Sequence, residues 1–466
     1  MAEAKTIDVA ELVESRKLGK VQIGIWALAF LMVFVDGFDF SGPLAGAPAI
    51  LRAFGAQKTE LGWVFSLGNF GALLGAYLFG YVNDRFGRRA AALAAVLCYT
   101  LPALGSGFAT SLTQLGLYRF VVGLGVGGIM PTAIAYLVEI APKRFRVTMV
   151  MCGVLGFTTG IAAVGQVAAW LIPVWGWQVM FFLPAFAGLA LCVFLYFVLP
   201  ESLRYLTLHK PDSAALRHRV QRIAPELEIG PQTRFTMPVQ PQAKGISPKP
   251  LFEGNQRIVT PLLWSGYFFE ALTFMALTNW FAVLLETLKL TPLQASLTYS
   301  YGAMIGIACV VLVAWLFDKL GPSAVAGAIL VSSASLIVLG IPGLSATMII
   351  VFGILSFAFA QACQGSFNGM VGVFYPTHIR GQGIGYAGAM GRLAQIIGPL
   401  VTGYLLSAVL PLQTTLMIVA TPFLIAAVIC IGLDIVYKRR FAGGEAAAVV
   451  AEPSRPVAAA AGGAGD

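Results

Sequence analysis

Charged residues are scarce in this chain of 466 residues: they make up 11% of it, whereas hydrophobic residues make up 58%. A soluble globule of this size needs more polar surface than such a composition supplies. The scarcity of charge therefore excludes a soluble globular fold. It also predicts that much of the surface faces lipid.

Signals of metal, redox and nucleotide chemistry are also missing. The cysteines lack CxxC spacing and fall within apolar stretches, which predicts core residues; they are Cys98, Cys152, Cys192, Cys309, Cys363 and Cys430. The glycine run GLGVGG at 123–128 follows no predicted strand and precedes no Lys-Ser/Thr, so it favours close helix packing over a phosphate loop. We therefore expect no cofactor, no metal and no nucleotide hydrolysis.

Long apolar runs recur along the whole chain. A bilayer core of roughly 30 Å needs about 20 apolar residues in a helix. Twelve runs qualify, at 22–50, 60–82, 90–110, 113–140, 147–171, 178–199, 258–286, 293–317, 322–341, 346–374, 383–408 and 411–436. Residues 1–22 are polar, so no signal peptide is expected and the first span is a retained helix. The sequence predicts an all-α membrane protein.

The net charge of +9 is not distributed as in a nucleic-acid-binding protein. Basic residues gather before the first span, in alternate loops, at 204–257 and after 437, whereas the opposite loops carry Arg52, Lys58 and Lys289. The positive-inside rule then predicts that both termini and the central loop are cytoplasmic. Lipid is the expected macromolecular environment, and no nucleic-acid partner is expected.

A polar stretch at 201–257 divides the spans six and six. We expect a cytoplasmic segment at 1–21, a six-helix bundle at 22–200, a linker at 201–257, a second bundle at 258–437 and a disordered tail at 438–466. An offset of 234 residues relates loop residues of the two halves: Asp84 with Asp318, Arg85 with Lys319, Gly87 with Gly321, Pro142 with Pro376, and Arg146 with Arg380. This indicates two pseudo-symmetric bundles in a parallel repeat.

Three groups of motifs resemble a known family. GYVNDRFGRR at 80–89 resembles the loop signature of the major facilitator superfamily, with matches at Gly80, Asp84, Arg85, Gly87, Arg88 and Arg89. LPESLRYL at 199–206 is similar to the end of the sixth helix in several of its families. DGFDFSG at 36–42 resembles the Asp-Gly-x-Asp signature of the aromatic acid:proton symporters, and the segments 119–139 and 375–399 also resemble that family. Asn83 and Phe40 depart from its usual pattern.

The resemblance implies the twelve-helix fold of that superfamily in a bacterial inner membrane. It also implies proton-coupled import of an aromatic carboxylate, such as a hydroxybenzoate or benzoate, by alternating access. The expected partners are this organic anion and protons, with the protein acting as a monomer. A sugar or other metabolite:proton symporter is the alternative, a drug-extruding antiporter ranks lower, and a transporter-like membrane sensor is the alternative from another class.

Ionisable residues within the spans are costly, by roughly 2.5–3.5 kcal/mol or more each, so they are candidates for function. Asp36 and Asp39 lie three residues apart on one face of the first span, where two close carboxylates resist ionising together. We expect this pair to carry the coupling proton; the alternative is an acidic pair satisfied by helix neighbours. Glu270, at the repeat-related position of Asp36, is either a second protonation site or an acid satisfied by Arg392.

Two arginines lie within the spans and cannot act as proton carriers. We expect Arg392 to bind the substrate carboxylate with its two-pronged guanidinium, and Arg119 to be the partner of the proton site, near Asp39. A fixed structural pair is the alternative. The resemblance places a functional arginine at both positions without dividing their roles.

Aromatic and amide residues are candidates for contact with a substrate ring, although packing is the alternative role for each. They are Phe38, Phe40, Phe157, Trp280 and Tyr386, with Asn279 and Gln395 as partners of a ring hydroxyl. The loop residues Gly80, Asp84, Arg85, Gly87, Arg88 and Arg89 are expected to form a cytoplasmic gate with Glu139. In it Asp84 would cap a neighbouring helix and Glu139 would pair with arginine. His378 is expected to be a solvated surface residue.

Overall fold

The computed structural model describes residues 6–15, 19–142, 144–224, 230, 233–237, 248–254, 256–376, 379–408 and 410–442. The position of His378 and most of the predicted tail lie outside these residues. Apart from two short strands, the regular elements are helices.

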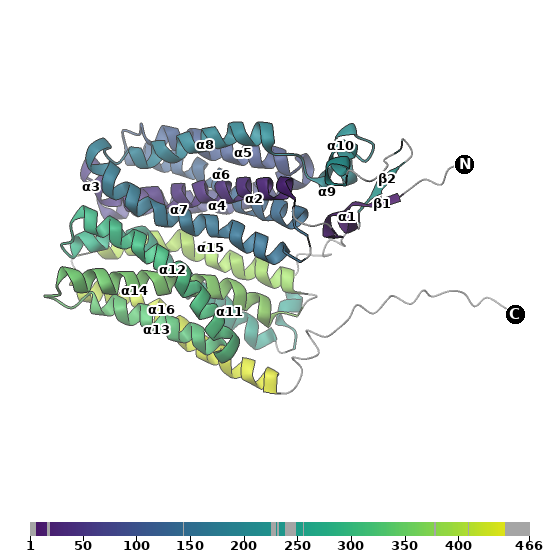
Figure 1. Cartoon of the computed structure of the whole chain (residues 1–466). Helices are drawn as coiled ribbons and strands as arrows, with labels where there is room; N and C mark the ends of the chain where they lie inside the picture. The colour runs from purple at the N-terminus through teal and green to yellow at the C-terminus, as the bar shows by residue number, and fades with distance from the viewer. Residues whose placement is uncertain are drawn as a thin grey trace.

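Two groups of six long helices form the molecule, and Figure 1 shows them as two layers. The N-terminal half contains α2 (Lys20–Ala45), α4 (Lys58–Phe86), α5 (Arg88–Ser106), α6 (Leu112–Ile140), α7 (Arg146–Trp175) and α8 (Val179–Val198). The C-terminal half contains α11 (Gln256–Thr287), α12 (Pro292–Leu320), α13 (Pro322–Val338), α14 (Ala346–Phe374), α15 (Arg380–Ser407) and α16 (Leu412–Ala442). Each predicted span overlaps one of these helices over most of its length, which confirms the fold class.

Not all twelve helices are alike in hydropathy. In the described part of the chain, 10 helices are long and apolar enough to cross a membrane, and Pro322–Val338 (α13) is a shorter apolar helix. The remaining one, α15, carries Arg380, Gln382, Arg392 and Gln395 in its glycine-rich sequence. These polar residues lower its hydropathy, and it is not among the 10 helices above.

The predicted first span, 22–50, was wrong at its end. The helix α2 stops at Ala45, and a separate short helix, α3 (Ala47–Phe54), follows Gly46. Pro48 lies in the first turn of α3, where its missing backbone N–H leaves no hydrogen bond unmade. The chain therefore turns at Gly46 instead of continuing as one helix.

The two halves meet mainly through α4 with α15 and α7 with α12. Their hydrogen bonds gather toward the end of the bundle that carries α3, which Figure 1 shows opposite β1 and the end of α16. At this end Arg52 of α3 forms an ion pair of 2.6 Å with Glu286 of α11. The two residues are 234 positions apart, which is the repeat offset. We call this end the α3 end, and the opposite one the terminal end. The halves are thus joined at the α3 end.

A small cluster at the terminal end was not expected from the sequence. The strand β1 (Thr6–Asp8) pairs in parallel with β2 (Arg234–Thr236), and the helices α1 (Val9–Ser15), α9 (Leu203–His209) and α10 (Ala214–Ile223) lie beside this sheet. Its apolar core includes Ile7, Val9, Leu206, Leu216, Val220 and Phe235. The predicted N-terminal segment and part of the linker therefore fold together; these elements are too short to give a clear periodic pattern.

The boundaries next to the C-terminal half differ slightly from the prediction. A 3₁₀ turn, η1 (Lys249–Phe252), precedes α11, and Thr260 donates a hydrogen bond to the backbone carbonyl of Leu251. The last helix continues to Ala442, so the chain is helical beyond the predicted boundary at 437.

Candidate functional site

Asp39 and Arg119 form a buried ion pair between α2 and α6. Arg119 Nη1 donates to both carboxylate oxygens of Asp39, at 3.2 and 3.0 Å, and Nη2 donates to its backbone carbonyl at 3.5 Å. The Asp39 side chain is 0% exposed and that of Arg119 is 11% exposed. The expected proximity of these two residues is therefore observed. Because each charge compensates the other away from water, removing one partner would leave a costly buried charge.

Asp36 lies one turn before Asp39 and is also buried, but it has no such partner. Its Oδ1 atom accepts no hydrogen bond from any described residue. It interacts electrostatically with Asp39 and Arg119 in its own half and with Arg392 of α15 in the other half. Asp36 is therefore the acid that links the charged groups of the two halves.

Arg392 of α15 is a partly buried cation in the C-terminal half. It interacts electrostatically with Tyr267, Tyr77 and Asp36. No ion pair to Arg392 is found within the described ranges. An arginine without a carboxylate at ion-pair distance keeps its two-pronged donor set available for an anion.

Glu270 of α11 is 0% exposed, and neither of its carboxyl oxygens has a hydrogen-bond partner in the described part of the chain. It interacts electrostatically with Tyr267, and with the buried Cys363 and Cys430 of α14 and α16. No ion pair joins it to Arg392 in the described structure, so the alternative in which Arg392 satisfies this acid finds no support. A charged carboxylate without a partner is costly in such surroundings.

Two of the predicted aromatic residues lie against each other. The rings of Phe40 and Phe157, from α2 and α7, are 5.5 Å apart, and both pack against the large core cluster that joins Ile161 and Ala162 of α7 to the C-terminal half. Phe38 instead packs within its own half, in a cluster with Val164 and Met180. Tyr386 of α15 stacks on Trp264 of α11, with ring centroids 5.6 Å apart.

The remaining ring candidates take part in packing near the α3 end. Trp280 donates from Nε1 to the backbone carbonyl of Pro399 at 3.1 Å, and its ring meets Phe65 of the other half edge-on. Asn279 donates to the backbone carbonyl of Met275 in its own helix at 2.7 Å. The backbone carbonyl of Gln395 accepts from Asn69 of α4 at 2.8 Å. Trp280 and Gln395 thus help to join the halves.

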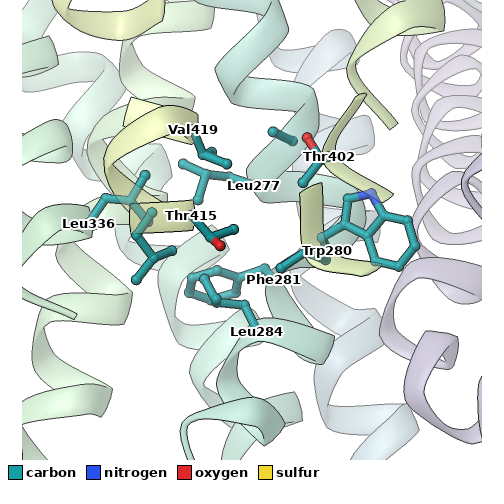
Figure 2. A pocket seen from close by; sticks show the side chains of 11 residues that line it. Leu277, Trp280, Phe281, Leu284, Leu336, Thr402, Thr415 and Val419 are labelled. Carbon is teal, nitrogen blue, oxygen red and sulfur yellow. The ribbon is translucent and has the colours of Figure 1, made fainter. Parts of the chain in front are cut away.

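Figure 2 shows a cavity beside Trp280 and Phe281, bounded by Leu336, Thr402, Thr415 and Val419 from three other helices. Its volume is about 20 Å³. This is close to the minimum that a single water molecule requires, so an aromatic acid does not fit. The cavity is a packing defect of the C-terminal half.

The predicted gate forms a connected set of contacts at the terminal end. Arg88 Nε donates to Glu139 Oε1 at 3.0 Å, and its Nη1 donates to the Asn83 carbonyl at 2.7 Å and to Asp84 at 3.4 Å. Ser202 donates to the second oxygen of Glu139. The expected pairing of Glu139 with an arginine is therefore observed. Asn83, which departs from the family pattern, also donates to Thr132 at 2.7 Å and so joins α4 to α6.

The capping role expected of Asp84 was wrong. Its side chain is 77% exposed, and the carboxylate at the N-terminus of α5 is that of Glu201, which accepts from the Arg89 backbone N–H at 3.2 Å. Gly87 allows this approach, because its φ is 93° and a Cβ there would lie 2.6 Å from Glu201 Oε2. Asp84 points outward because it lies in the last turn of α4, before the chain reverses.

The other gate residues differ in how closely they are held. Arg85 donates to the Tyr81 hydroxyl at 2.8 Å, and Arg89 donates to the backbone carbonyl of Tyr196. A Cβ at Gly80 would meet no atom within 4 Å, so nothing in this conformation requires a glycine there. Sequence reasoning missed Glu201 and Ser202, although the Pro-Glu-Ser sequence that ends the sixth span placed polar residues next to the gate.

Comparison with known proteins agrees with this architecture. The model of the Major Facilitator Superfamily matches residues 29–371. The 4-hydroxybenzoate transporter PcaK of Pseudomonas aeruginosa is 32% identical over 399 residues, which is 84% of this chain and 88% of the relative. The transporter of the same name from Acinetobacter baylyi is 29% identical over 408 residues, covering 87% and 89%.

Solved structures show the same fold. A bacterial homologue of the human lysosomal transporter Spinster, in an inward-facing and unoccupied conformation, superimposes with a TM-score of 0.68. The match covers 92% of this chain and 99% of that one, at 15% identity. The family model matches most of the spans, and the chain therefore belongs to the Major Facilitator Superfamily.

Proposed function

We propose that the protein is a proton-coupled importer of an aromatic carboxylate, such as a hydroxybenzoate or benzoate, in the bacterial inner membrane. The names of its relatives support the substrate class. The observation that carries the proposal is Arg392, a partly buried guanidinium that has no ion-pair partner in the described structure and interacts with Asp36 across the two halves. Such a group offers two parallel hydrogen bonds to a carboxylate.

The relation between Arg392 and Asp36 gives a physical reason for coupling. A substrate carboxylate on Arg392 would be repelled by an ionised Asp36, and a proton on Asp36 removes that repulsion. Substrate and proton would then bind more tightly together than separately. Asp39, whose charge Arg119 already compensates, would leave the net charge of the site unchanged. Glu270 would be a second protonation site within the C-terminal half.

The aromatic ring would lie between the halves. Phe40 and Phe157 are the best supported candidates for it, because their rings lie together on α2 and α7, two helices that contact α11 and α12 of the other half. Tyr386 of α15 is a further candidate. Phe38, Asn279, Trp280 and Gln395 have packing contacts of their own, which leaves their sequence-based assignment with weaker support.

Alternating access would open and close the two ends in turn. The contacts at the α3 end join the halves in this structure, so we assign it to the state that is closed at that end. With the termini on the cytoplasmic side, as the distribution of basic residues predicts, this is an inward-facing state. The set of Arg88, Glu139 and Ser202 would stabilise one of the end states. We propose that a monomer suffices, because each half contributes to the site.

Uptake into proteoliposomes tests the proposal. Labelled 4-hydroxybenzoate, benzoate and a hexose are compared under an inward proton gradient, with and without a protonophore. We expect uptake of the aromatic acids, its loss with the protonophore, and no uptake of the hexose. Arg392→Lys should raise KM for the acids, because an ammonium lacks the two-pronged geometry. Arg257→Lys, at an exposed position in the first turn of α11, is the control. Hexose uptake, or an unchanged KM in Arg392→Lys, would refute this assignment.

A further inference from the structure

A polar cluster lies beside Arg392, made of residues that the sequence analysis did not select. The Tyr267 hydroxyl of α11 donates to Asn368 Oδ1 of α14 at 2.5 Å, and Gln364 Nε2 donates to the same hydroxyl at 3.3 Å. Asn368 Nδ2 donates to the backbone carbonyl of Gln364 at 3.1 Å. We call these three residues the α14 cluster.

The α14 cluster is close to the proposed carboxylate ligand. The ring of Tyr267 packs directly over Gly391, since a Cβ at that glycine would overlap the ring. Arg392 follows Gly391 in α15 and interacts electrostatically with Tyr267. Three helices of the C-terminal half therefore bring phenol, amide and guanidinium groups to one place.

The fold itself does not require polar residues at these positions. The repeat offset relates Tyr267 to Val33, Gln364 to Met130 and Asn368 to Ile134, all apolar. In the N-terminal half, Val33 is 0% exposed in an apolar cluster against which Met130 packs. Because polar side chains within a membrane span are costly, their presence in one half indicates a role beyond packing.

The α14 cluster keeps hydrogen-bonding capacity. An amide side chain has two N–H donors and an oxygen with two lone pairs. Asn368 uses one of the donors and one of the lone pairs in the contacts above, and its side chain is exposed. Gln364 Oε1 accepts no hydrogen bond from the described residues. A hydroxyl group could therefore both donate to and accept from Asn368.

We infer that the α14 cluster is the subsite that recognises a polar ring substituent, a phenolic hydroxyl, on the aromatic acid whose carboxylate Arg392 binds. This inference rests on the proposed function and specifies its substrate class. Asn279, the sequence-based candidate for this contact, is 2% exposed and donates within its own helix, so Asn368 is the better-placed partner. A site that hydrogen-bonds a hydroxyl discriminates against an analogue that lacks it, because its polar groups are then left unpaired.

The test is a ratio of transport efficiencies. Counterflow into proteoliposomes, which needs no proton gradient, gives kcat/KM for 4-hydroxybenzoate and for benzoate. The wild type should prefer the hydroxylated acid. Asn368→Leu and Tyr267→Phe should lower this preference by roughly tenfold, the effect of about one hydrogen bond, because kcat/KM falls more for 4-hydroxybenzoate than for benzoate. Tyr375→Phe, at a buried tyrosine whose hydroxyl donates to Thr260 within the C-terminal half, is the matched control and should leave the ratio unchanged.

Other outcomes separate the two proposals. An equal loss for both acids in Asn368→Leu and Tyr267→Phe would show that the cluster only orients Arg392, and would overturn the inference. An unchanged ratio would overturn it as well. If the wild type carries neither acid, the proposed function fails and the inference fails with it. Tyr267→Phe keeps the ring over Gly391, and the melting temperature of each variant verifies that it folds.

Discussion

Ser66 and Ser300, which the repeat offset relates, make the same hydrogen bond to the opposite half of the protein. Ser66 Oγ of α4 donates to the Ile396 carbonyl of α15 at 2.7 Å, and Ser300 Oγ of α12 donates to the Ala162 carbonyl of α7. The two acceptors are themselves related by 234 residues, the separation of Arg52 and Glu286. The closure near the α3 end is thus two-fold symmetric at the level of single hydrogen bonds.

Close backbone contact supports each of these hydrogen bonds in the same way. A Cβ at Gly62 would lie 2.9 Å from the Pro399 carbonyl oxygen, and one at Gly165 would overlap the Ser296 carbonyl. The repeat relates Gly62 to Ser296 and Gly165 to Pro399. Each serine hydrogen bond therefore has a glycine one turn away that lets the helices approach.

Ser66→Ala and Ser300→Ala should each destabilise the closed α3 end by about 0.5–1.5 kcal/mol, and the double variant by about the sum. Spin labels at Thr110 and Lys289, exposed positions of the two halves near that end, report its opening by their distance distribution in a cysteine-free background. An effect of one serine without the other would contradict the symmetric closure. Ser265→Ala, at a partly buried serine that bonds within its own helix, is the control.

Arg119→Ala should destabilise the protein by about 3–5 kcal/mol, because it leaves the Asp39 carboxylate buried without a counter-charge. Arg119→Ala with Asp39→Asn should recover much of this loss, since no unpaired charge remains. Thermal unfolding in detergent measures both. A double variant as unstable as Arg119→Ala would show that packing, rather than charge, accounts for the loss.

Asp36→Asn should abolish uptake driven by a proton gradient while counterflow of the acid continues, because the amide removes the repulsion from the substrate and cannot carry a proton. Asp318→Asn, at an exposed acid in the last turn of α12, should retain both activities. Accumulation against a concentration gradient in Asp36→Asn would remove this residue from the coupling mechanism.

Glu270→Gln tests the second proposed protonation site. If this acid exchanges a proton during transport, the pH profile of uptake should change in the variant. The packing beside Cys363 and Cys430 should be little altered, since the side chains are similar in volume. A profile that coincides with that of the wild type excludes Glu270 from coupling.

Glu201→Gln should destabilise the terminal end by about 0.5–2 kcal/mol, since the carboxylate at the N-terminus of α5 loses its charge and part of its hydrogen bonding. Asp84→Asn should have a smaller effect, because Asp84 is exposed. Hydrogen exchange of the first turn of α5 distinguishes the two. Equal protection in both variants would argue against Glu201 as the cap.

The spans and the two halves were predictable, because length and hydropathy are local properties of the sequence. The Asp39–Arg119 proximity followed from the family resemblance, which implies a fold in which the first and fourth spans lie close together. The break at Gly46 was not, since Pro43 and Pro48 are compatible with a bent helix as well as with two helices. The cap at α5 depends on how the end of α8 approaches Gly87, and the α14 cluster depends on the packing of α11 against α14. Neither contact has a signal in the sequence of one helix.

The pairing of β1 with β2 changes the length of chain that connects the halves. The cluster that contains β2 is held to the N-terminal half by the Glu14–Arg146 ion pair of 2.8 Å and by Arg219, which donates to the Glu201 carbonyl. The described chain resumes at Pro248, and η1 contacts α11 of the other half. Met237 and Pro248 are eleven positions apart, so covalent geometry lets these two points separate by at most about 36–40 Å. This distance is an upper limit on the separation that rocking of the halves can produce at these points, and deletions between them should restrict the widest opening.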